Sequence, residues 1–380
     1  SVLSADTTGP IADGTRVTFT VQVDVPPGAN PADSDAVAIV ATSVNSPTVH
    51  FATATLTTTA LSGQRGYVFN ADDEEIDVVD TVLHVNTGLA IDTSPYGDYP
   101  IRGALSPDGR WLYASLRDSD RVLVIDTATH SAVITLPVGS RPTGIAFAAD
   151  SATAFVANRE SDTVSVIDTS VPTVTTTIPV GDRPYSVASS PCLDKVYVTN
   201  KYGGSISVID AGTLTVTKVI TGFSGPWGVE ISPYGDRAYV SNTWNGTVGV
   251  IDTASDSLVD TWDVGGAALA GLDVSADGHT VYVADRWGGV THAVDASTGQ
   301  VVATIPTGAA WEVEAFPLGA GPFVYVSNVD GGGVTVVDVN TNSIVETIWL
   351  GGGPRGLALF PPPTSCYARV YLPLIARNYP

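Results

Sequence analysis

Residues 195–210 read KVYVTNKYGGSISVID, and this stretch decides the fold. It contains two runs of β-branched and aromatic residues, 196–199 and 206–209, separated by a polar turn with two glycines. In the second run apolar and small polar residues alternate with the two-residue period of a strand. Asn200 closes the first run and Asp210 the second. The stretch therefore predicts two successive β-strands, and amphipathic helical periodicity is missing almost everywhere else in the chain.

The pattern recurs through most of the sequence. An aspartate after an apolar strand pattern returns every 42 to 46 residues, at Asp80, Asp126, Asp168, Asp210, Asp252, Asp295 and Asp338. Each copy holds two more strand patterns, one ending in Pro-Val-Gly or similar and one of the kind at 228–233. Four strands in each of seven units, from Gly66 to about Phe360, predict an all-β, seven-bladed β-propeller. We expect the repeated aspartate to cap the turn into the next strand and to take no part in catalysis.

The two ends of the repeat region predict how the ring closes. The first copy begins at the second strand of a blade, residues 67–70, and the last copy ends on an innermost strand, residues 356–360. Pairing these strands completes one blade from both ends of the repeat region. It leaves no open sheet edge at the junction.

Composition excludes several classes of function. The 380 residues carry 17 basic and 39 acidic side chains, a net charge of −22, which argues against binding nucleic acid or anionic membrane surfaces. With 44% hydrophobic and 15% charged residues, the chain can bury a large core and is not disordered. The longest apolar stretch, 36–41, is far shorter than the roughly 20 residues that span a bilayer, so we expect no membrane insertion.

The composition also favours export. The fraction of charged residues is low, and Thr, Gly and Val are abundant. Only three lysines occur, Lys195, Lys201 and Lys218. The sequence starts at Ser1 without an initiator Met, and we expect that a signal peptide has been removed. We expect an extracellular or cell-surface location.

Two motifs resemble a known repeat family. Tyr-Val-Thr-Asn at 197–200 and Val-Ile-Asp-Thr at 124–127, 166–169 and 250–253 resemble the YVTN-type propeller repeat of archaeal and bacterial surface-layer proteins. The resemblance covers residues 66–360 in seven copies and is looser in the first and sixth. It implies a propeller fold and a cell-surface setting, and it implies no reaction.

The segments outside the ring carry other strand patterns. Val17, Phe19, Val21 and Val23 alternate with polar residues as in a half-buried strand. Together with 36–43 and 49–59 they resemble the latter half of the immunoglobulin-like repeats of bacterial surface proteins, most specifically at 25–29. A full sandwich needs about seven strands, and only three fit before Ala60. We therefore expect a partial immunoglobulin-like β domain at 1–62, the propeller at 63–362 and a C-terminal tail strand at 363–380.

The tail strand supplies a possible partner for the incomplete domain. Val370, Leu372 and Leu374 form its apolar face. Strand addition would satisfy both segments, either within one molecule or between molecules, and in the second case it propagates head to tail into a ring or filament. We expect the filament, with other copies of the chain as partners. The alternative is a tail that packs against its own propeller.

The cysteines leave two alternatives open. Cys192 follows one innermost strand, and Cys366 follows the innermost strand that closes the ring, three or four blades away by the repeat count. A disulfide needs Cα atoms within about 7 Å. We expect either two unpaired thiols or a bridge that the tail makes possible by crossing the face or reaching a neighbouring molecule.

Catalytic motifs are missing, so we expect no catalytic residues, no cofactor, no resident metal and no enzyme activity. The five histidines are scattered, without metalloprotease spacing, and neither a nucleophile elbow nor a Walker loop occurs. Three aligned columns nevertheless deserve weight as binding sites.

In the first column, Tyr202, Trp244 and Trp287 occupy the same turn on three successive blades. We expect them to form a ligand-binding strip that could stack on sugar rings. The alternative is that each ring covers its own glycine-rich turn.

The second column places Glu230, Asp273 and Glu314 on adjacent innermost strands, where they line the channel, either solvated or holding a cation. The third column lies at the channel mouth, where arginine could clamp an anion or bond between blades: Arg141, Arg183, Trp227, Trp311 and Arg355.

Three functions compete on this evidence. The first, which we favour, is a non-enzymatic structural or adhesive surface protein. The second is a carbohydrate- or ligand-binding propeller that uses the aromatic strip and recognises surface glycans. The third is a propeller enzyme with a channel metal at Glu230, Asp273 and Glu314.

Overall fold

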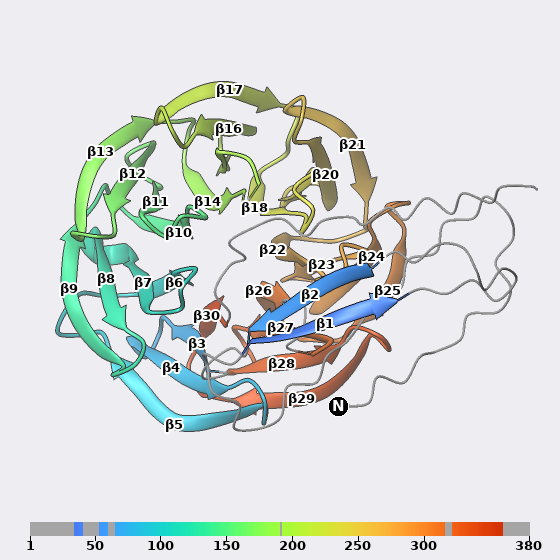
Figure 1. The fold of residues 1–380 in the computed structure, drawn as a ribbon, viewed down its shortest axis with the longest axis horizontal. Coiled ribbons are helices and arrows are strands. Elements are labelled where there is room, and N and C mark those ends of the chain that lie inside the picture. The colour runs from blue at the N-terminus through green and yellow to red at the C-terminus, as the bar shows by residue number, and fades with distance from the viewer. Residues whose placement is uncertain (1–33, 41–52, 60–64, 191, 316–320, 360–380) are drawn as a thin grey trace, which may run out of the picture. The chain divides into compact units, whose positions relative to one another are not determined.

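The computed structural model describes residues 34–40, 53–59, 65–190, 192–315 and 321–359. The chain divides into two compact units, the larger of which comprises residues 65–317 and 321–367. Among the described residues of this larger unit, seven four-stranded antiparallel sheets form a ring (Figure 1). The predicted all-β, seven-bladed propeller is therefore confirmed.

Each blade runs from an innermost to an outermost strand. The first blade consists of β30 (Pro354–Ala358), β3 (Arg65–Asn70), β4 (Glu75–Asp80) and β5 (Val85–Asp92). The second and third are β6 (Pro100–Leu105), β7 (Trp111–Leu116), β8 (Arg121–Asp126), β9 (Ser131–Pro137), then β10 (Pro142–Phe147), β11 (Thr153–Asn158), β12 (Thr163–Asp168), β13 (Thr173–Pro179). The fourth and fifth are β14 (Pro184–Ser189), β15 (Lys195–Asn200), β16 (Ser205–Asp210), β17 (Thr215–Thr221), then β18 (Pro226–Ile231), β19 (Arg237–Asn242), β20 (Thr247–Asp252), β21 (Ser257–Asp263). The sixth and seventh are β22 (Leu269–Val274), β23 (Thr280–Asp285), β24 (Val290–Asp295), β25 (Val301–Ile305), then β26 (Ala310–Ala315), β27 (Phe323–Asn328), β28 (Gly333–Asp338), β29 (Ser343–Trp349).

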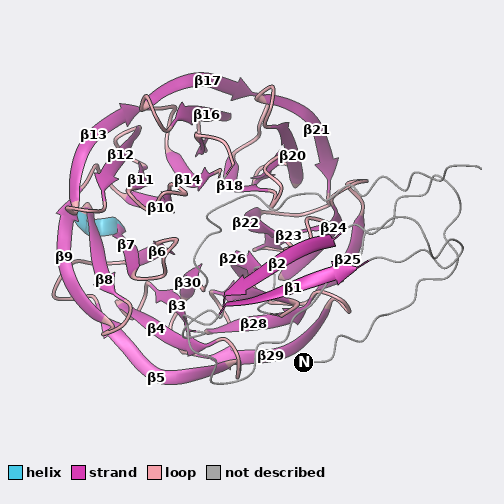
Figure 2. Cartoon of the chain, in the orientation of Figure 1, coloured by secondary structure: helices cyan, strands magenta, loops and turns pink. Residues whose placement is uncertain are grey.

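Helix is almost missing from the described part of the chain. Its single helical element is a short 3₁₀ turn, Arg117–Ser119, between β7 and β8 (Figure 2). All other regular structure there is strand, as the period-2 patterns predict.

The first blade joins the two ends of the repeat region. β30 pairs with β3 in antiparallel register, with Tyr67 opposite Ala358 and Phe69 opposite Gly356. The predicted closure is confirmed, and the innermost strand extends from Pro354 to Ala358. Since β30 covers the inner edge of β3, the ring has no unpaired strand at this junction.

Burial explains which residues occupy which strand. The second and third strands of each blade are covered on both faces, as in β15, where the five residues after Lys195 are all buried. Their sequences are accordingly rich in Val, Ile and Tyr. The outermost strands expose most of their side chains, and two of them are rich in threonine, β13, which reads TVTTTIP, and β17, which reads TVTKVIT.

The repeated aspartates cap the turns that follow the third strands. In every copy a backbone N–H two or three residues later donates to the aspartate carboxylate, for example Ala128 N to Asp126 Oδ1 at 2.9 Å and Thr213 N to Asp210 Oδ1 at 2.7 Å. The other five aspartates accept the corresponding bonds at Asp80, Asp168, Asp252, Asp295 and Asp338. The predicted structural role is confirmed, because these bonds satisfy donors that the turn leaves unpaired.

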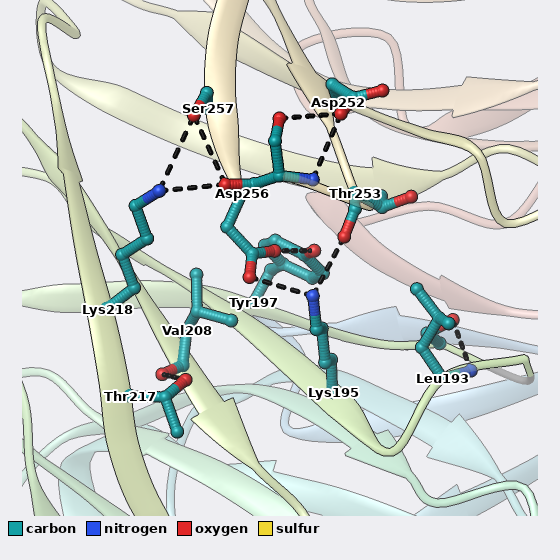
Figure 3. A network of polar contacts seen from close by, with 12 residues as sticks. Leu193, Lys195, Tyr197, Val208, Thr217, Lys218, Asp252, Thr253, Asp256 and Ser257 are labelled. Atoms are coloured by element: carbon teal, nitrogen blue, oxygen red, sulfur yellow. Dashed lines mark hydrogen bonds and ion pairs between the residues drawn. The ribbon is translucent and has the colours of Figure 1, made fainter.

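A buried tyrosine of the second strand links several blades to the next one. The Tyr197 hydroxyl donates to Asp256 Oδ1 at 2.6 Å, and Lys195 Nζ donates to Asp256 Oδ2 at 2.8 Å, so both fasten the β20–β21 turn of the following blade (Figure 3). Tyr67 with His130, Tyr282 with Asn342 and Tyr325 with the Thr81 carbonyl make equivalent contacts. Burial raises the pKa of Tyr67 to about 12, so its hydroxyl keeps its proton at neutral pH.

The described part of the smaller unit is a two-stranded sheet. β1 (Ser34–Val40) pairs antiparallel with β2 (Thr53–Thr59), with Ala38 opposite Thr55. β2 falls within the segment expected at 49–59, whereas β1 overlaps the segment expected at 36–43 and begins two residues before it. The predicted strand containing Val17, Phe19, Val21 and Val23, and the tail strand containing Val370, Leu372 and Leu374, lie outside the described residues.

Within the described residues, no helix has the length and apolar character needed to span a bilayer.

Candidate functional site

The innermost strands enclose the candidate site. They line a channel cavity of about 280 Å³, with contributions from β6, β10, β14, β18, β22, β26 and β30. All seven innermost strands begin at the same face because each blade repeats the same strand order. Residues early in these strands therefore lie toward one mouth of the channel, and residues at the fifth position lie deeper.

Arg102 crosses the channel near that mouth. It projects from β6, forms an ion pair with Glu312 of β26, and its Nη1 lies 3.4 Å from Ser186 Oγ of β14. Its guanidinium also lies 5.2 Å from the Tyr185 ring centroid. Arg102 is only 6% exposed, so three blades meet through one buried cation. This layer separates the mouth from the deeper cavity.

The deeper cavity is acidic. Glu230, Asp273 and Glu314 occupy matching positions on β18, β22 and β26 and line the cavity together. Asp273 accepts bonds from Ala315 N at 2.7 Å and Val274 N at 2.6 Å, and Glu230 Oε1 accepts one from Ile231 N at 3.0 Å. Both Glu314 oxygens lie 2.9 Å from Leu359 N, which donates to them. The predicted channel column therefore comes together in space.

The electrostatics of the channel follow from burial. Burial raises the pKa of Glu230 well above its ordinary range, and the neighbouring Asp273 carboxylate raises it further. Burial also raises the pKa of Asp273 to about 7, against the two backbone N–H bonds that favour its charged form. The same cause raises the pKa of Glu312 to about 7, although the Arg102 guanidinium opposes the shift. Near neutral pH these groups therefore hold some of the protons that exposed carboxylates would have lost.

In the part of the chain that the structure describes, no three His, Cys, Asp or Glu side chains are grouped so that they could hold a metal ion. The channel carboxylates Glu230, Asp273 and Glu314 do not form such a group.

Aromatic and cationic side chains stack at the mouth. Tyr185 and Trp227 have ring centroids 4.3 Å apart, and Trp227 and Trp311 are 5.1 Å apart. The Arg355 guanidinium lies 5.1 Å from the Trp311 ring and donates to Asp72 Oδ1 at 2.9 Å. Three of the five predicted mouth residues, Trp227, Trp311 and Arg355, thus belong to one buried cluster.

The other two predicted mouth residues lie on the exposed turns before the innermost strands. Arg141 Nη2 is 3.3 Å from Asp118 Oδ1, and Arg183 Nη2 is 3.6 Å from Glu160 Oε2. Both backbones have positive φ, 53° and 52°. Both arginines therefore form ion pairs with carboxylates at the surface. We had considered hydrogen bonds from these arginines to backbone carbonyls of neighbouring blades.

The sequence comparison of columns missed four cations of the mouth face. They occupy the first position after the second strand, directly beside the column we aligned: Arg117, Arg159, Lys201 and Arg286. Lys201 Nζ lies 3.7 Å from the Trp227 ring centroid, and the Arg286 guanidinium lies 4.5 Å from that of Trp311. The sequence could have indicated these cations, because four of the seven copies carry Lys or Arg at this position in a chain with only 17 basic residues.

The aromatic strip lies on the same face, at the turns between second and third strands. Tyr202, Trp244 and Trp287 are 49%, 54% and 77% exposed. Tyr202 and Trp244 meet edge to face with centroids 5.6 Å apart. Trp244 also covers Gly225, whose φ of +62° and close approach to the indole leave no room for a side chain. Each turn ends on a glycine with positive φ, as at Gly204, so the aromatic residue stands at the tip.

Cys192 is disulfide-bonded. It lies in the turn between β14 and β15, and Cys366 lies outside the described residues. The two ways we considered for the tail to reach Cys192 stay predictions.

By its fold the chain is a seven-bladed β-propeller, and residues 97–271 match the model of the YNCE-like beta-propeller family. This match runs from just before β6 into β22. No curated protein matches the chain.

Three solved structures show the same fold at low sequence identity. Kuenenia stuttgartiensis hydrazine synthase matches with a TM-score of 0.62 and 23% identity, over 68% of this chain and 88% of that one. A functionally unknown protein from Desulfotomaculum acetoxidans DSM 771 matches with a TM-score of 0.67 and 16% identity, over 78% and 99%. Dihydro-heme d1 dehydrogenase NirN in complex with DHE matches with a TM-score of 0.59 and 17% identity, over 77% and 64%. At these identities the likeness shows the fold alone.

Proposed function

We propose that the protein is a non-enzymatic, exported cell-surface propeller that adheres to glycans through the strip of Tyr202, Trp244 and Trp287. The observation that carries the proposal is the exposure of three large aromatic side chains at the same turn of three successive blades. Exposed aromatic groups are typical of binding surfaces, since they offer a broad apolar face at little cost in side-chain entropy. A sugar ring presents a matching C–H face.

The strip is built to stay in place. Tyr202 and Trp244 contact each other, and the Arg183 guanidinium lies 4.5 Å from the Tyr202 ring. Gly225 fixes the other side of Trp244. Little ordering is then needed when a flat ligand binds, and preorganised surfaces lose less free energy on binding.

A glycan array probed with the full chain tests the proposal. We expect binding to a subset of glycans, with at least a tenfold loss in the Trp244→Ala and Trp287→Ala variants. Trp349→Ala is the matched control, because Trp349 is 69% exposed on the outermost strand β29 of another blade and does not belong to the strip. Its binding should equal that of the wild type. The proposal fails if no glycan binds, or if the strip variants bind as well as the control.

A structural role by self-assembly is a second candidate. Within the described residues, β1 and β2 pair only with each other, so a further strand could be added to this sheet. We propose that the tail strand with Val370, Leu372 and Leu374 adds to the N-terminal β domain of a neighbouring molecule. Added backbone hydrogen bonds and buried alternate side chains are the usual source of affinity in strand addition.

Negative-stain microscopy of the full chain and of a variant lacking residues 367–380 tests assembly. The deletion keeps Cys366, so the disulfide chemistry is unchanged. Filaments from the full chain and monomers from the variant are expected. Filaments from both, or from neither, would contradict strand exchange.

A further inference from the structure

Four buried side chains at the channel mouth carry N–H groups without an acceptor among the described residues. They are Arg102 Nε, Trp227 Nε1, Trp311 Nε1 and Arg355 Nε. Their side chains belong to residues only 6 to 9% exposed. Buried donors are nearly always paired in folded proteins, and an unpaired one costs free energy. Four of them in one place call for an explanation.

These donors form one continuous layer. The indoles of Trp227 and Trp311 meet edge to face with ring centroids 5.1 Å apart, and the Arg355 guanidinium lies 5.1 Å from the Trp311 ring centroid. On the other side, Tyr185 lies between Trp227 and Arg102. Its ring centroid is 4.3 Å from that of Trp227 and 5.2 Å from the Arg102 guanidinium. The layer draws on β6, β14, β18, β26 and β30, so five blades converge on it.

Two further cations border the layer. Lys201 Nζ lies 3.7 Å from the Trp227 ring centroid, and the Arg286 guanidinium lies 4.5 Å from the Trp311 ring centroid. Both side chains are half-buried. Among the described residues, neither forms an ion pair with a carboxylate, whereas Arg102 is paired with Glu312 and Arg355 with Asp72.

Lys201 and Arg286 therefore leave positive charge at this layer that no described carboxylate pairs with. Burial lowers the pKa of Lys201 to about 7, and the cations Arg159, Arg102 and Arg286 lower it further. Arg159 itself has its Nη1 3.7 Å from Glu160 Oε1. In a chain with a net charge of −22, cations that repel one another at a channel mouth are unusual. An anion there would relieve the repulsion and supply acceptor oxygens.

We propose that the mouth binds a small ligand through a phosphate or carboxylate group, held by Lys201 and Arg286 above the indoles of Trp227 and Trp311. Charge-assisted bonds from ammonium and guanidinium groups to oxyanions are the strong ones in proteins. The buried indole and guanidinium N–H groups beneath complete an environment that favours negative charge. This site is separate from the aromatic strip, and its test does not depend on whether the strip binds glycans.

Thermal unfolding and tryptophan fluorescence of the full chain test the site. Inorganic phosphate and citrate are titrated separately at about pH 6.5, against sodium chloride at equal ionic strength. A ligand that binds the folded state raises the melting temperature as its concentration rises. We expect one of the two anions to do so beyond the chloride control and to change the indole fluorescence. Which of them acts decides between a phosphate and a carboxylate ligand.

Variants locate the effect. Lys201→Met and Arg286→Gln should each weaken binding of the active anion about tenfold, as loss of a charged hydrogen bond does. Arg141→Gln removes the same charge from the same face at an exposed side chain, and it should change affinity less than about twofold. Trp311→Phe keeps an aromatic ring at this position, although a smaller one, and removes the N–H donor, so it should weaken binding while the protein stays folded. The proposal is overturned if neither anion exceeds chloride, or if Lys201→Met and Arg141→Gln behave alike.

Discussion

The carboxyl groups of Glu230 and Asp273 lie on neighbouring innermost strands and line the same channel cavity. Their side chains are partly exposed within the cavity and are packed among the innermost strands. Burial raises the pKa of both, so ionising them opposes folding. At the scale of single residues, the channel is therefore a place where the protein gives up stability as the pH rises.

Glu230→Gln should relieve this cost. The pKa of Glu230 in the folded state lies above the unfolded value of about 4.3. At pH values between these two pKa values the folded state binds more protons than the unfolded state, so stability falls as the pH rises through this range. The variant keeps the Oε1 atom that accepts from Ile231 N. We expect equal stability of variant and wild type near pH 4, and a gain for the variant on the order of 1 kcal/mol by pH 8.

Urea unfolding at several pH values measures this difference. The same substitution at Glu346, which is exposed on β29, provides the control. A difference between Glu230→Gln and wild type that does not change from pH 4 to pH 8 would contradict the assignment.

At the scale of elements, the asparagine that ends the second strand holds a blade together. Asn200 Nδ2 donates to Ser205 Oγ at 3.1 Å and to Ser207 Oγ at 3.0 Å on the third strand. Its Oδ1 accepts from Gly181 N at 3.1 Å in the loop before the innermost strand. One buried amide thus connects three segments. Asn158 and Asn242 donate comparable bonds to the third strands of their own blades, and Asn328 Nδ2 donates to the Thr307 carbonyl at 2.7 Å in the loop before β26.

Asn200→Ala should destabilise the protein by about 2–3 kcal/mol, because it leaves buried donors and hydroxyls without partners. Chemical denaturation followed by intrinsic fluorescence measures the loss. Asn340→Ala, at an exposed turn residue, should cost less than about 0.5 kcal/mol. Equal losses for the two variants would show that the buried amide does not hold the blade.

At the scale of the whole propeller, closure depends on β30. This strand covers the inner edge of β3 and adds residues 357 and 358 to the channel lining. Ring closure thereby replaces an exposed edge with a ladder of backbone hydrogen bonds. Without it, an unpaired edge and apolar surface would be open to other chains.

Truncation after Gly353 removes β30 and should lower the melting temperature by on the order of 10 °C or more. It should also promote association, detected by light scattering, since the β3 edge becomes available. Truncation after Leu359 keeps β30 and removes the rest of the chain, so it is the matched control. If both truncated proteins melt together, the closing strand is not what stabilises the ring.

Much of this protein was predictable from local patterns. Period-2 alternation predicted the strands, the spacing of Asp80 to Asp338 predicted seven blades, and the partial first copy predicted closure by residues near 356–360. The turn-capping role of the aspartates was predictable as well, because the bonded N–H groups lie only two or three residues away. The strands and the turn caps depend on neighbours in the chain, and the number of blades and the closure follow from the regular spacing of the repeat, which is why the sequence by itself determined them.

The aligned repeats predicted that Glu230, Asp273 and Glu314 line the channel, but the tertiary structure alone decided which side chains meet across it. Arg102 and Glu312 are far apart in sequence, and only the curvature of the ring brings their strands together across the axis. Long side chains such as Lys201 and Arg286 have many rotamers, and packing against Trp227 and Trp311 selects among them. Burial within that ring, which no local pattern encodes, then sets the charge balance at the mouth and the raised pKa of Asp273 below it.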